Sequence, residues 1–187
     1  MRLEGGNDLV WQPLARARLG MLDLNWFKRE VRYSLTPLGM ANDRLRQTGG
    51  RYRDETTYDY MMRMGVWTEN LSLPAIVNEC LMQSYDGVIR LFPNTTNLGK
   101  AAFRELRASG AFLVSAAWDG KLVLDVKLKS EKGAAARIVN PWGTAKAEVH
   151  ALSSGTAVSY RQGDGLLELP TKAGESYTLR AAQARKR

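Results

Sequence analysis

The sequence is poor in the two side chains that most often hold metals or act as nucleophiles and bases. It has one cysteine, Cys80, so neither an intramolecular disulfide nor a cluster of thiolate ligands can form. It has one histidine, His150, with no metal-binding or triad motif around it, which argues against a histidine-rich metal site and a Ser-His-Asp triad. His150 falls in a predicted strand, where we expect a half-exposed structural residue. We expect no metal and no cofactor, so carboxylates, amides and aromatic rings remain to carry any chemistry.

Long hydrophobic runs are also missing. No apolar stretch approaches the roughly 20 residues that a membrane-spanning helix needs, so we expect no membrane partner. The start of the chain, MRLEGGNDLV, lacks the basic-then-apolar pattern of a signal peptide. Because Met1 lies close to a predicted helix, we expect the natural reading frame to begin upstream, and the missing signal says little about where the protein works.

The net charge of +8 belongs to the second half of the chain. Residues 1–86 hold 11 Lys/Arg and 11 Asp/Glu, whereas residues 87–187 hold 16 Lys/Arg and 8 Asp/Glu. Three of these cations are the C-terminal Arg185, Lys186 and Arg187, and a basic terminus is more often solvated than bound to nucleic acid. We therefore expect no nucleic-acid partner and keep polyanion binding as a third interpretation.

The first half of the chain has the pattern of helices joined by loops. A first helix is expected to have Pro13 in its first turn, where the missing N–H is harmless, and to stop at Gly20. A second is expected to run from the cap Asn25 to Pro37. The polar segment 47–60 has paired glycines and no hydrophobic period, which predicts either a functional loop or a plain surface excursion.

The clearest helix is predicted over residues 72–84. Ser72 is the expected N-cap, and Pro74 is expected in the first turn. Apolar residues follow the i, i+3, i+4, i+7, i+8 spacing of a buried stripe: Leu73, Ile76, Val77, Cys80 and Leu81. Cys80 is therefore expected to be a core residue rather than a nucleophile.

Near the Asp86-Gly87 turn the hydrophobic period changes from that of a helix to that of a strand. Short alternating segments follow about ten residues apart: VIRLF, FREL, AFLVSAA, KLVLDVKL, ARIVN, AEVHA, AVSYR, LLEL and SYTLR. The Asp-Gly pairs at 119–120 and 164–165 predict tight hairpins. This rhythm predicts an antiparallel β-sandwich.

One short segment, GVWTEN at residues 65–70, gathers groups suited to sugar chemistry just ahead of the expected cap. A helix N-terminus presents free N–H groups and a positive dipole end, so the Glu69 carboxylate would be held ionised and oriented to act as a base. Trp67 offers an apolar face to a sugar ring, and Asn70 offers a donor and an acceptor to sugar hydroxyls. On these residues alone, a helix-end charge beside a packed tryptophan is the stronger interpretation.

Three longer motifs change that balance: ECLMQSYDGVIRLFPN at residues 79–94, FRELRASGAFLVSAAWDGKL at 103–122 and NPWG at 140–143. Together they resemble the C-terminal region of glycoside hydrolase family 95, the family of α-L-fucosidases and α-L-galactosidases. In that family an apolar helix leads to a Gly-Val-Ile-Arg-Leu strand, and a Trp-Asp-Gly-Lys-Leu hairpin follows. The match is good over residues 79–125 and fair over 65–142.

The resemblance implies an α+β chain. Residues 1–86 would be the last helices of an (α/α)₆ toroid, the catalytic domain, and residues 87–187 a C-terminal antiparallel β-sandwich. It further implies an inverting glycoside hydrolase that acts on a carbohydrate substrate and is secreted or periplasmic. The glutamic general acid and the rest of the catalytic domain are expected upstream, so this chain alone is expected to be inactive.

The resemblance also assigns roles to the GVWTEN segment. The family's base-side aspartate lies in a Gln-Ile-Asp-Gly-Asn-Phe motif just before the last toroid helix, and the corresponding residues 66–71 read VWTENL. The base-side role therefore passes to Glu69, with Asn70 orienting the water and Trp67 stacking on the sugar. Trp11, on a neighbouring predicted helix, is a weaker second platform. Because glutamate reaches further than aspartate, the change implies a displaced water and a different sugar preference.

The main alternative is a non-catalytic carbohydrate-binding or structural module. Trp118, Trp142 or Tyr160 on the sandwich would then supply the binding surface, although packing against the hairpin at 119–120 is the stronger interpretation for Trp118. The toroid interpretation makes a further prediction. Six helical hairpins close such a ring, so helix faces in this short chain should be open and apolar, and self-association should follow.

Overall fold

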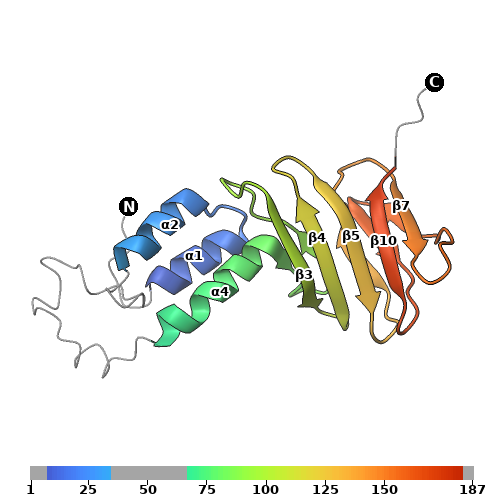
Figure 1. Ribbon diagram of the computed structural model, residues 1–187, viewed down its shortest axis with the longest axis horizontal. Coiled ribbons are helices and arrows are strands. Elements are labelled where there is room, and N and C mark those ends of the chain that lie inside the picture. The colour runs from blue at the N-terminus through green and yellow to red at the C-terminus, as the bar shows by residue number, and fades with distance from the viewer. Residues whose placement is uncertain (1–7, 35–66, 183–187) are drawn as a thin grey trace, which may run out of the picture. The chain divides into compact units, whose positions relative to one another are not determined.

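A computed structural model describes residues 8–34 and 67–182 of the chain (Figure 1). Helices come first along the chain, and the strands that follow pair antiparallel. The chain is therefore of the α+β class, as predicted. The predicted helix end at Pro37 and the predicted loop at 47–60 lie outside the described residues.

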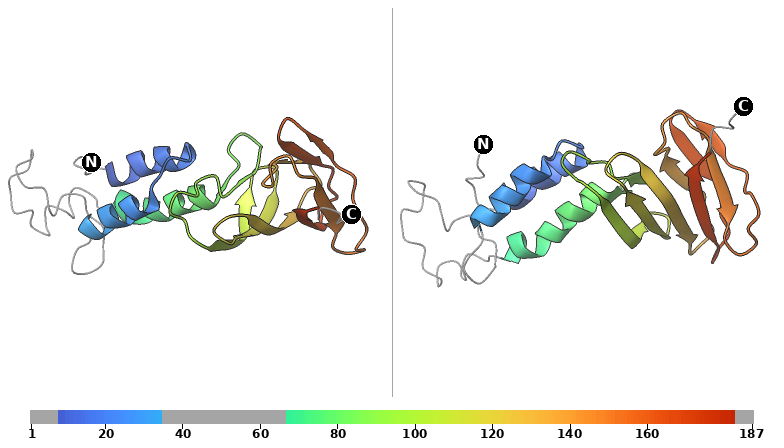
Figure 2. Two further views of the ribbon diagram at one scale, coloured as in Figure 1. Left: turned by 90° about the horizontal axis from the view of Figure 1, so that it is seen from above. Right: turned by 45° about the horizontal axis from the view of Figure 1, so that its top comes forward.

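The chain forms two compact units, Met1–Cys80 and Leu81–Arg187. The first holds the helices and the second holds the strands, and Figure 2 shows these elements from two further directions. The last helix ends at Leu81 and the first strand begins at Met82, ahead of the turn at which the hydrophobic period changes. The assignment of residues 1–86 to a catalytic domain and of residues 87–187 to a β-sandwich domain stays a prediction.

Helix α1 (Asp8–Arg18) begins earlier than its proline suggested. Pro13 lies inside the helix rather than in its first turn, so that prediction was wrong. Val10, Pro13 and Ala17 are buried at the i, i+3, i+7 spacing of one helix face, and burial of Val10 draws the residues ahead of the proline into the helix. The helix stops at Gly20 (φ +69) as predicted, where the N–H groups of Gly20 and the next residue donate to carbonyls of the last turn (3.1 and 2.8 Å) in a Schellman cap.

Helix α2 (Leu24–Ser34) is capped by Asp23. Asp23 Oδ1 accepts hydrogen bonds from the backbone N–H groups of Asn25 (2.8 Å) and Trp26 (3.2 Å). The prediction of Asn25 as the cap was therefore wrong. Both residue types cap well, but Leu24 is buried and belongs to the helix, which places the cap ahead of it.

Helix α4 (Trp67–Leu81) begins five residues before the predicted cap. Ser72 is an interior residue and Pro74 lies inside the helix, so both predictions were wrong. A proline removes one intrahelical hydrogen bond, but it does not prevent the turn ahead of it from forming.

The buried face of α4 is narrower than predicted. Ile76 (0% exposed) and Cys80 (1%) are buried, and Leu73 and Leu81 are half-buried. Val77 is 47% exposed, against the prediction. The spacing identified the apolar residues correctly, but it could not show that the face carrying Val77 would border an open groove.

Helix α1 makes a polar contact with each of the other two described helices. Arg18 Nη2 lies 3.1 Å from Glu79 Oε1 on α4, and the Arg16 guanidinium lies 4.7 Å from the centroid of a Trp26 ring on α2. Exposed pairs of this kind contribute up to about 1 kcal/mol each. Burial of the apolar faces therefore matters more for holding these helices together.

The strand unit contains three sheets among the described residues. The smallest pairs β1 (Met82–Gln83) with β2 (Arg90–Leu91). The largest has the order β3 (Ala101–Ala108), β4 (Phe112–Trp118), β5 (Val123–Ser130), β10 (Ser176–Ala181) and β7 (Ala147–Ala151). The third has the order β6 (Ala136–Val139), β9 (Leu166–Leu169) and β8 (Arg161–Gly163).

Most of the predicted segments form strands, with two departures. In AVSYR only Arg161 belongs to a strand, so that prediction was largely wrong. In β3 the pairing with β4 shifts between Phe103 and Leu106, and Glu105 adopts φ +54 at this bulge.

One hydrophobic core is shared by the five-stranded and three-stranded sheets. Its best-buried residues come from both, and each is at most 1% exposed: Val114, Val126, Leu128, Leu179, Ile138, Leu167 and Leu169. Burial alternates along β6 and β9, as the period of two predicted. Burying one such side chain fully contributes about 1.5–3 kcal/mol, so this shared core is the main source of stability in the unit.

Both predicted Asp-Gly pairs lie in turns between paired strands, but only the second forms the tight two-residue hairpin that was predicted, since residues 119–122 make a four-residue connection. Asp164 (φ +50) and Gly165 (φ +73) join β8 to β9 in a two-residue turn with both φ angles positive, as a type I′ hairpin requires. Between β4 and β5 the Asp119 carboxylate accepts hydrogen bonds from the N–H groups of Leu122 (2.8 Å) and Lys121 (2.7 Å). These bonds stabilise the carboxylate and lower the pKa of Asp119.

The turn between β1 and β2 is braced by an ion pair. Arg90 donates to both carboxylate oxygens of Asp86 (2.7 and 2.6 Å), and the Val88 N–H donates to the same carboxylate (3.1 Å). The Arg90 guanidinium holds the pKa of Asp86 well below its usual range. Gly87 supplies the positive φ (+76) that the turn needs.

Gly133 and Gly174 both have positive φ angles, but only Gly133 lies close to another part of the backbone. A Cβ added at Gly133 (φ +75) would meet the Ala173 backbone nitrogen at 2.9 Å, whereas one at Gly174 (φ +79) would meet nothing within 4 Å. Both alanine variants impose left-handed strain of about 1–2 kcal/mol, but only Gly133→Ala must also displace backbone. In urea unfolding, we expect Gly133→Ala to lower the free energy of unfolding by at least about 1 kcal/mol more than Gly174→Ala does. Equal losses of stability would show that the backbone at Gly133 does not approach the backbone at Ala173 closely.

Candidate functional site

The site predicted from the sequence lies in the first turn of α4. The backbone of Trp67, Glu69 and Asn70 is helical, rather than preceding a cap at Ser72. Their side chains lie outside the described part of the chain. The roles assigned to them, base for Glu69, sugar platform for Trp67 and water orientation for Asn70, therefore stay predictions.

The earlier start of α4 defines the backbone setting of Glu69. The first four N–H groups of an α-helix lack an intrahelical acceptor and carry the positive end of the helix dipole. Glu69 is the third residue of α4, so it belongs to this turn. A carboxylate there is favoured in its ionised form by about 0.3–1 kcal/mol.

The second predicted platform, Trp11, lies on α1 and is 63% exposed. Leu19 (73%) and Met21 (69%), at the end of the same helix, are more exposed still. Large apolar side chains at such exposure offer surface for a ligand or for another part of the protein. Contact of Trp11 with a sugar stays a prediction.

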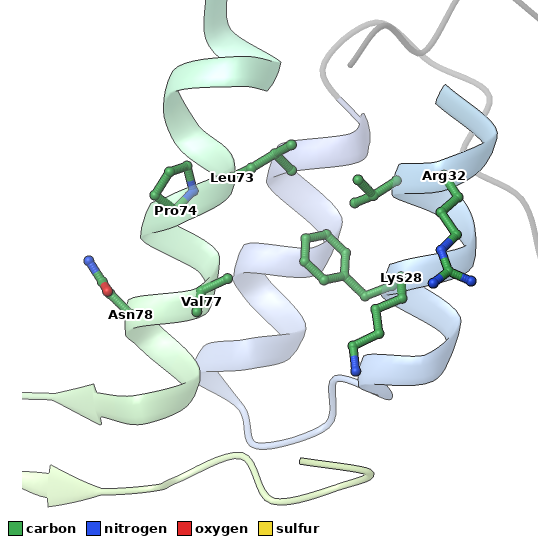
Figure 3. Close-up of a pocket in the computed structure, with 8 residues that line it drawn as sticks. Lys28, Arg32, Leu73, Pro74, Val77 and Asn78 are labelled. Atoms are coloured by element: carbon green, nitrogen blue, oxygen red, sulfur yellow. The ribbon is translucent and has the colours of Figure 1, made fainter. Parts of the chain in front are cut away.

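An apolar groove of about 610 Å³ lies between α2 and α4 (Figure 3). It is lined by Phe27, Lys28, Val31 and Arg32 of α2 and by Leu73, Pro74, Val77 and Asn78 of α4. None of these eight side chains is a carboxylate or a histidine, so the groove lacks the usual groups for general acid–base chemistry. Its composition suits contact with another apolar surface.

The groove accounts for the exposure of Val77. This side chain lines the groove and is about half covered by its neighbours (Figure 3). The toroid interpretation predicted open, apolar helix faces. The groove is open among residues 8–34 and 67–182 alone, so that prediction stays untested for the whole chain. The self-association expected to follow from it stays a prediction.

The single cysteine and the single histidine have the structural roles predicted for them. Cys80 is 1% exposed, and its burial, with a smaller contribution from Glu79, raises the pKa of the thiol to about 11. His150 lies half-buried in β7, with Nδ1 3.1 Å from the Gly155 carbonyl oxygen. Over residues 8–34 and 67–182, no three His, Cys, Asp or Glu side chains are grouped to hold a metal ion.

The buried thiol makes stability sensitive to alkaline pH. The pKa of Cys80 rises from 9.0 to about 11 on folding, so above pH 9 the unfolded state loses its proton first. Stability is therefore unaffected by this group at neutral pH and falls as the pH rises through the window between these values. We expect thermal melts from pH 8 to 11 to show a steeper decline for the wild type than for Cys80→Ala, which has no ionisable group there. Parallel curves would show that the thiol is not buried.

The aromatic residues considered for a non-catalytic module are packed into the strand unit. Trp118 lies 6.1 Å from Phe92 between ring centroids, so it packs against the core of the unit. Trp142 Nε1 donates to a backbone carbonyl of β5 (2.8 Å), and the Tyr160 hydroxyl donates to the Ala147 carbonyl (2.7 Å). All three are partly buried against the core. All three rings therefore stabilise the strand unit. For Trp118 and Trp142 this weakens the interpretation that they form a carbohydrate-binding surface.

A second pocket, of about 380 Å³, lies on the three-stranded sheet and was not predicted. Its charged lining residues are Arg137, Arg161 and Glu168, and Tyr160 also lines it. The three charged residues are far apart in the sequence and meet only through strand pairing. Their alternation with buried residues was visible in the predicted strands, but the pairing that joins them was not.

Comparison with known proteins assigns no family to the chain, since no family model and no curated protein matches it. One similar solved structure is the catalytic domain of GH30 xylanase C from Talaromyces cellulolyticus, at 19% identity and a TM-score of 0.32. The match covers 44% of this chain and 21% of that one, so the chain spans about a fifth of the xylanase domain. A likeness at this level supports no conclusion about fold or function. Within the described ranges no helix has the length and apolar character needed to cross a membrane.

Proposed function

We propose that this chain is the C-terminal part of an inverting glycoside hydrolase similar to family 95, which cleaves glycosidic bonds in oligo- or polysaccharides. In this proposal α1, α2 and α4 are the last helices of an (α/α)₆ toroid, and the two larger sheets form a C-terminal β-sandwich. The hydrophobic core shared by those sheets supports the second assignment. The groove between α2 and α4, which is open among the described residues, is compatible with the first, because the helices of a toroid pack against further helices.

The order of elements along the chain is the observation that carries the proposal. Residues 79–94 cover the end of α4 and the β1–β2 hairpin, and residues 103–122 cover most of β3, all of β4 and the turn that follows. The resemblance requires an apolar helix, then a Gly-Val-Ile-Arg-Leu strand, then a Trp-Asp-Gly-Lys-Leu hairpin. The motifs and the elements thus agree in kind and in sequence order.

In the proposed reaction Glu69 acts on the water side. Its carboxylate takes a proton from a water held by Asn70, and the water oxygen attacks the anomeric carbon. The bond to the leaving oxygen breaks on the opposite face, and an acid from the upstream part of the toroid protonates that oxygen. Inverting enzymes hold the two carboxyl groups about 6.5–9.5 Å apart to admit the water. Trp67 stacks on the apolar face of the sugar.

Turnover of aryl fucosides, galactosides and arabinosides tests the proposal. The protein required carries this chain together with the upstream helices that complete the toroid. We expect hydrolysis of at least one of these substrates, with inversion at the anomeric carbon detected by NMR. The 187-residue chain alone should be inactive, because it holds one of the two catalytic carboxylates. Retention of configuration, or no turnover of any of the three by the longer protein, would contradict the proposal.

A further inference from the structure

The pocket on the three-stranded sheet contains a row of charged side chains. Arg137 of β6 and Arg161 of β8 are both register partners of Glu168 on β9, the central strand. Directly paired residues have Cβ atoms about 4.5–5.5 Å apart, so the three side chains stand next to one another on one face of the sheet. Two guanidinium groups therefore flank one carboxylate, and the row carries a net positive charge.

Glu168 leaves N–H donors of both Arg137 and Arg161 available for other hydrogen bonds. Arg161 Nη2 lies 2.8 Å from Glu168 Oε2, but the Arg161 side chain is 87% exposed. Arg137 Nε lies 3.6 Å from Glu168 Oε1, beyond hydrogen-bonding range, and its side chain is 47% exposed. A guanidinium has five N–H donors, so both arginines retain donors for an anionic ligand.

Tyr160 gives the same pocket a fixed aromatic surface. Its hydroxyl donates to the Ala147 carbonyl (2.7 Å) and accepts from the Ala147 N–H (2.9 Å), while its ring packs against the core. A side chain already held in place loses little conformational freedom when a ligand binds. Ser159 and Pro170 complete a lining of hydroxyl and apolar groups around a volume of about 380 Å³. Ligand pockets commonly measure about 300–1,000 Å³.

We propose that this pocket binds the carboxylate of a uronic acid residue in an acidic saccharide. Guanidinium groups match carboxylates in planar, bidentate geometry, which supplies the affinity. Glu168, between the two arginines, accepts hydrogen bonds from neighbouring sugar hydroxyls, and Tyr160 contacts the apolar face of the ring. The choice of a saccharide rests on the proposed function, whereas the choice of a carboxylate rests on the two arginines. The role is retention of an acidic glycan by the strand unit, not bond cleavage.

Calorimetric titration of the 187-residue chain with digalacturonate and with neutral galactobiose tests this assignment. We expect digalacturonate to bind and galactobiose to show no binding at the same concentrations. Arg161→Gln and Arg137→Gln should each weaken digalacturonate binding by at least about 10-fold, since each removes charge-assisted hydrogen bonds. Both side chains are well exposed, so the variants should keep the wild-type circular dichroism spectrum.

Arg180→Gln is the matched control. Arg180 of β10 also pairs with an exposed carboxylate on the neighbouring strand, Asp125 (2.8 Å), but this pair lies on the five-stranded sheet. Its loss should leave digalacturonate binding unchanged. A weakening equal to that of Arg161→Gln would mean that only the overall positive charge attracts the ligand, which would overturn the proposal.

Other results would also overturn the proposal. These are no binding of digalacturonate by the wild type, or equal affinity in the wild type and Arg161→Gln. Displacement of digalacturonate by an equal concentration of acetate would show that the pocket takes any carboxylate rather than a saccharide. The titration involves no turnover, so its failure is distinguishable from that of the proposed function. A longer protein that hydrolyses aryl glycosides while this chain binds no uronate would disprove the pocket alone.

Discussion

Replacing Glu69 with glutamine should reduce turnover by about 10²–10⁴-fold, the usual contribution of general-base assistance. Glutamine keeps the length and hydrogen-bonding shape of the side chain but cannot take the proton of the attacking water. The Michaelis constant should change little, because the proposed function assigns sugar stacking to Trp67 and not to Glu69. The measurement is steady-state kinetics on the best aryl glycoside, with the protein that carries this chain and the upstream helices.

Glu79→Gln is the control for that experiment. It makes the same chemical change on the same helix, near the C-terminal end of α4, where Glu79 pairs with Arg18 (3.1 Å). A small loss of stability is expected, but the folded protein should turn over substrate at the wild-type rate. If Glu69→Gln is as active as the wild type, Glu69 is only a helix-end charge, and the catalytic base lies outside this chain.

Helix starts were the least predictable part of the helical unit, for a physical reason. Asp23 and Asn25 are equally good caps by residue type, and burial of Leu24 between them decides which one acts. At α4 the Ser72 cap signal and the proline that follows it were overridden, and the helix begins at Trp67. Local signals give several possible starts, and at α2 tertiary burial selects one of them. The helix stop at Gly20 was predictable because its positive φ (+69) is a property of glycine itself.

The strand unit was more predictable, because alternation and turn chemistry point to the same elements. The Asp164-Gly165 pair has the backbone that a two-residue hairpin requires, and it fixes the register between β8 and β9. Local pattern did not reveal the bulge at Glu105, which depends on the pairing of β3 with β4.

The candidate sites also differ in how well the sequence predicts them. Trp67, Glu69 and Asn70 are close in sequence, so a motif could single them out. Arg137 and Glu168 become neighbours only through the pairing of β6 with β9. Composition and spacing do not encode that pairing, so sequence reasoning found the local cluster and missed the pocket built across strands.

Substituting aspartate at two adjacent positions of α4 should give opposite results. Ile76 is 0% exposed, so Ile76→Asp buries a carboxylate among apolar groups at a cost of several kcal/mol, roughly half or more of a typical domain's stability. Val77 is 47% exposed at the groove, and Val77→Asp leaves its carboxylate solvated, with an expected change below about 1 kcal/mol. Thermal unfolding followed by circular dichroism at 222 nm should show loss of the cooperative helical transition in Ile76→Asp only.

The comparison also tests whether the groove is open in the chain by itself. Lys28 lines the same groove, so an aspartate at Val77 has a cation on the facing helix. If Val77→Asp unfolds the helical unit as Ile76→Asp does, that face is covered in solution, and the toroid argument from unpaired helix faces fails. If neither variant changes the melt, α4 buries no face at all, and the helical stripe read from the sequence is wrong. A stable Val77→Asp beside an unfolded Ile76→Asp leaves the groove exposed in this chain, as the proposed toroid requires.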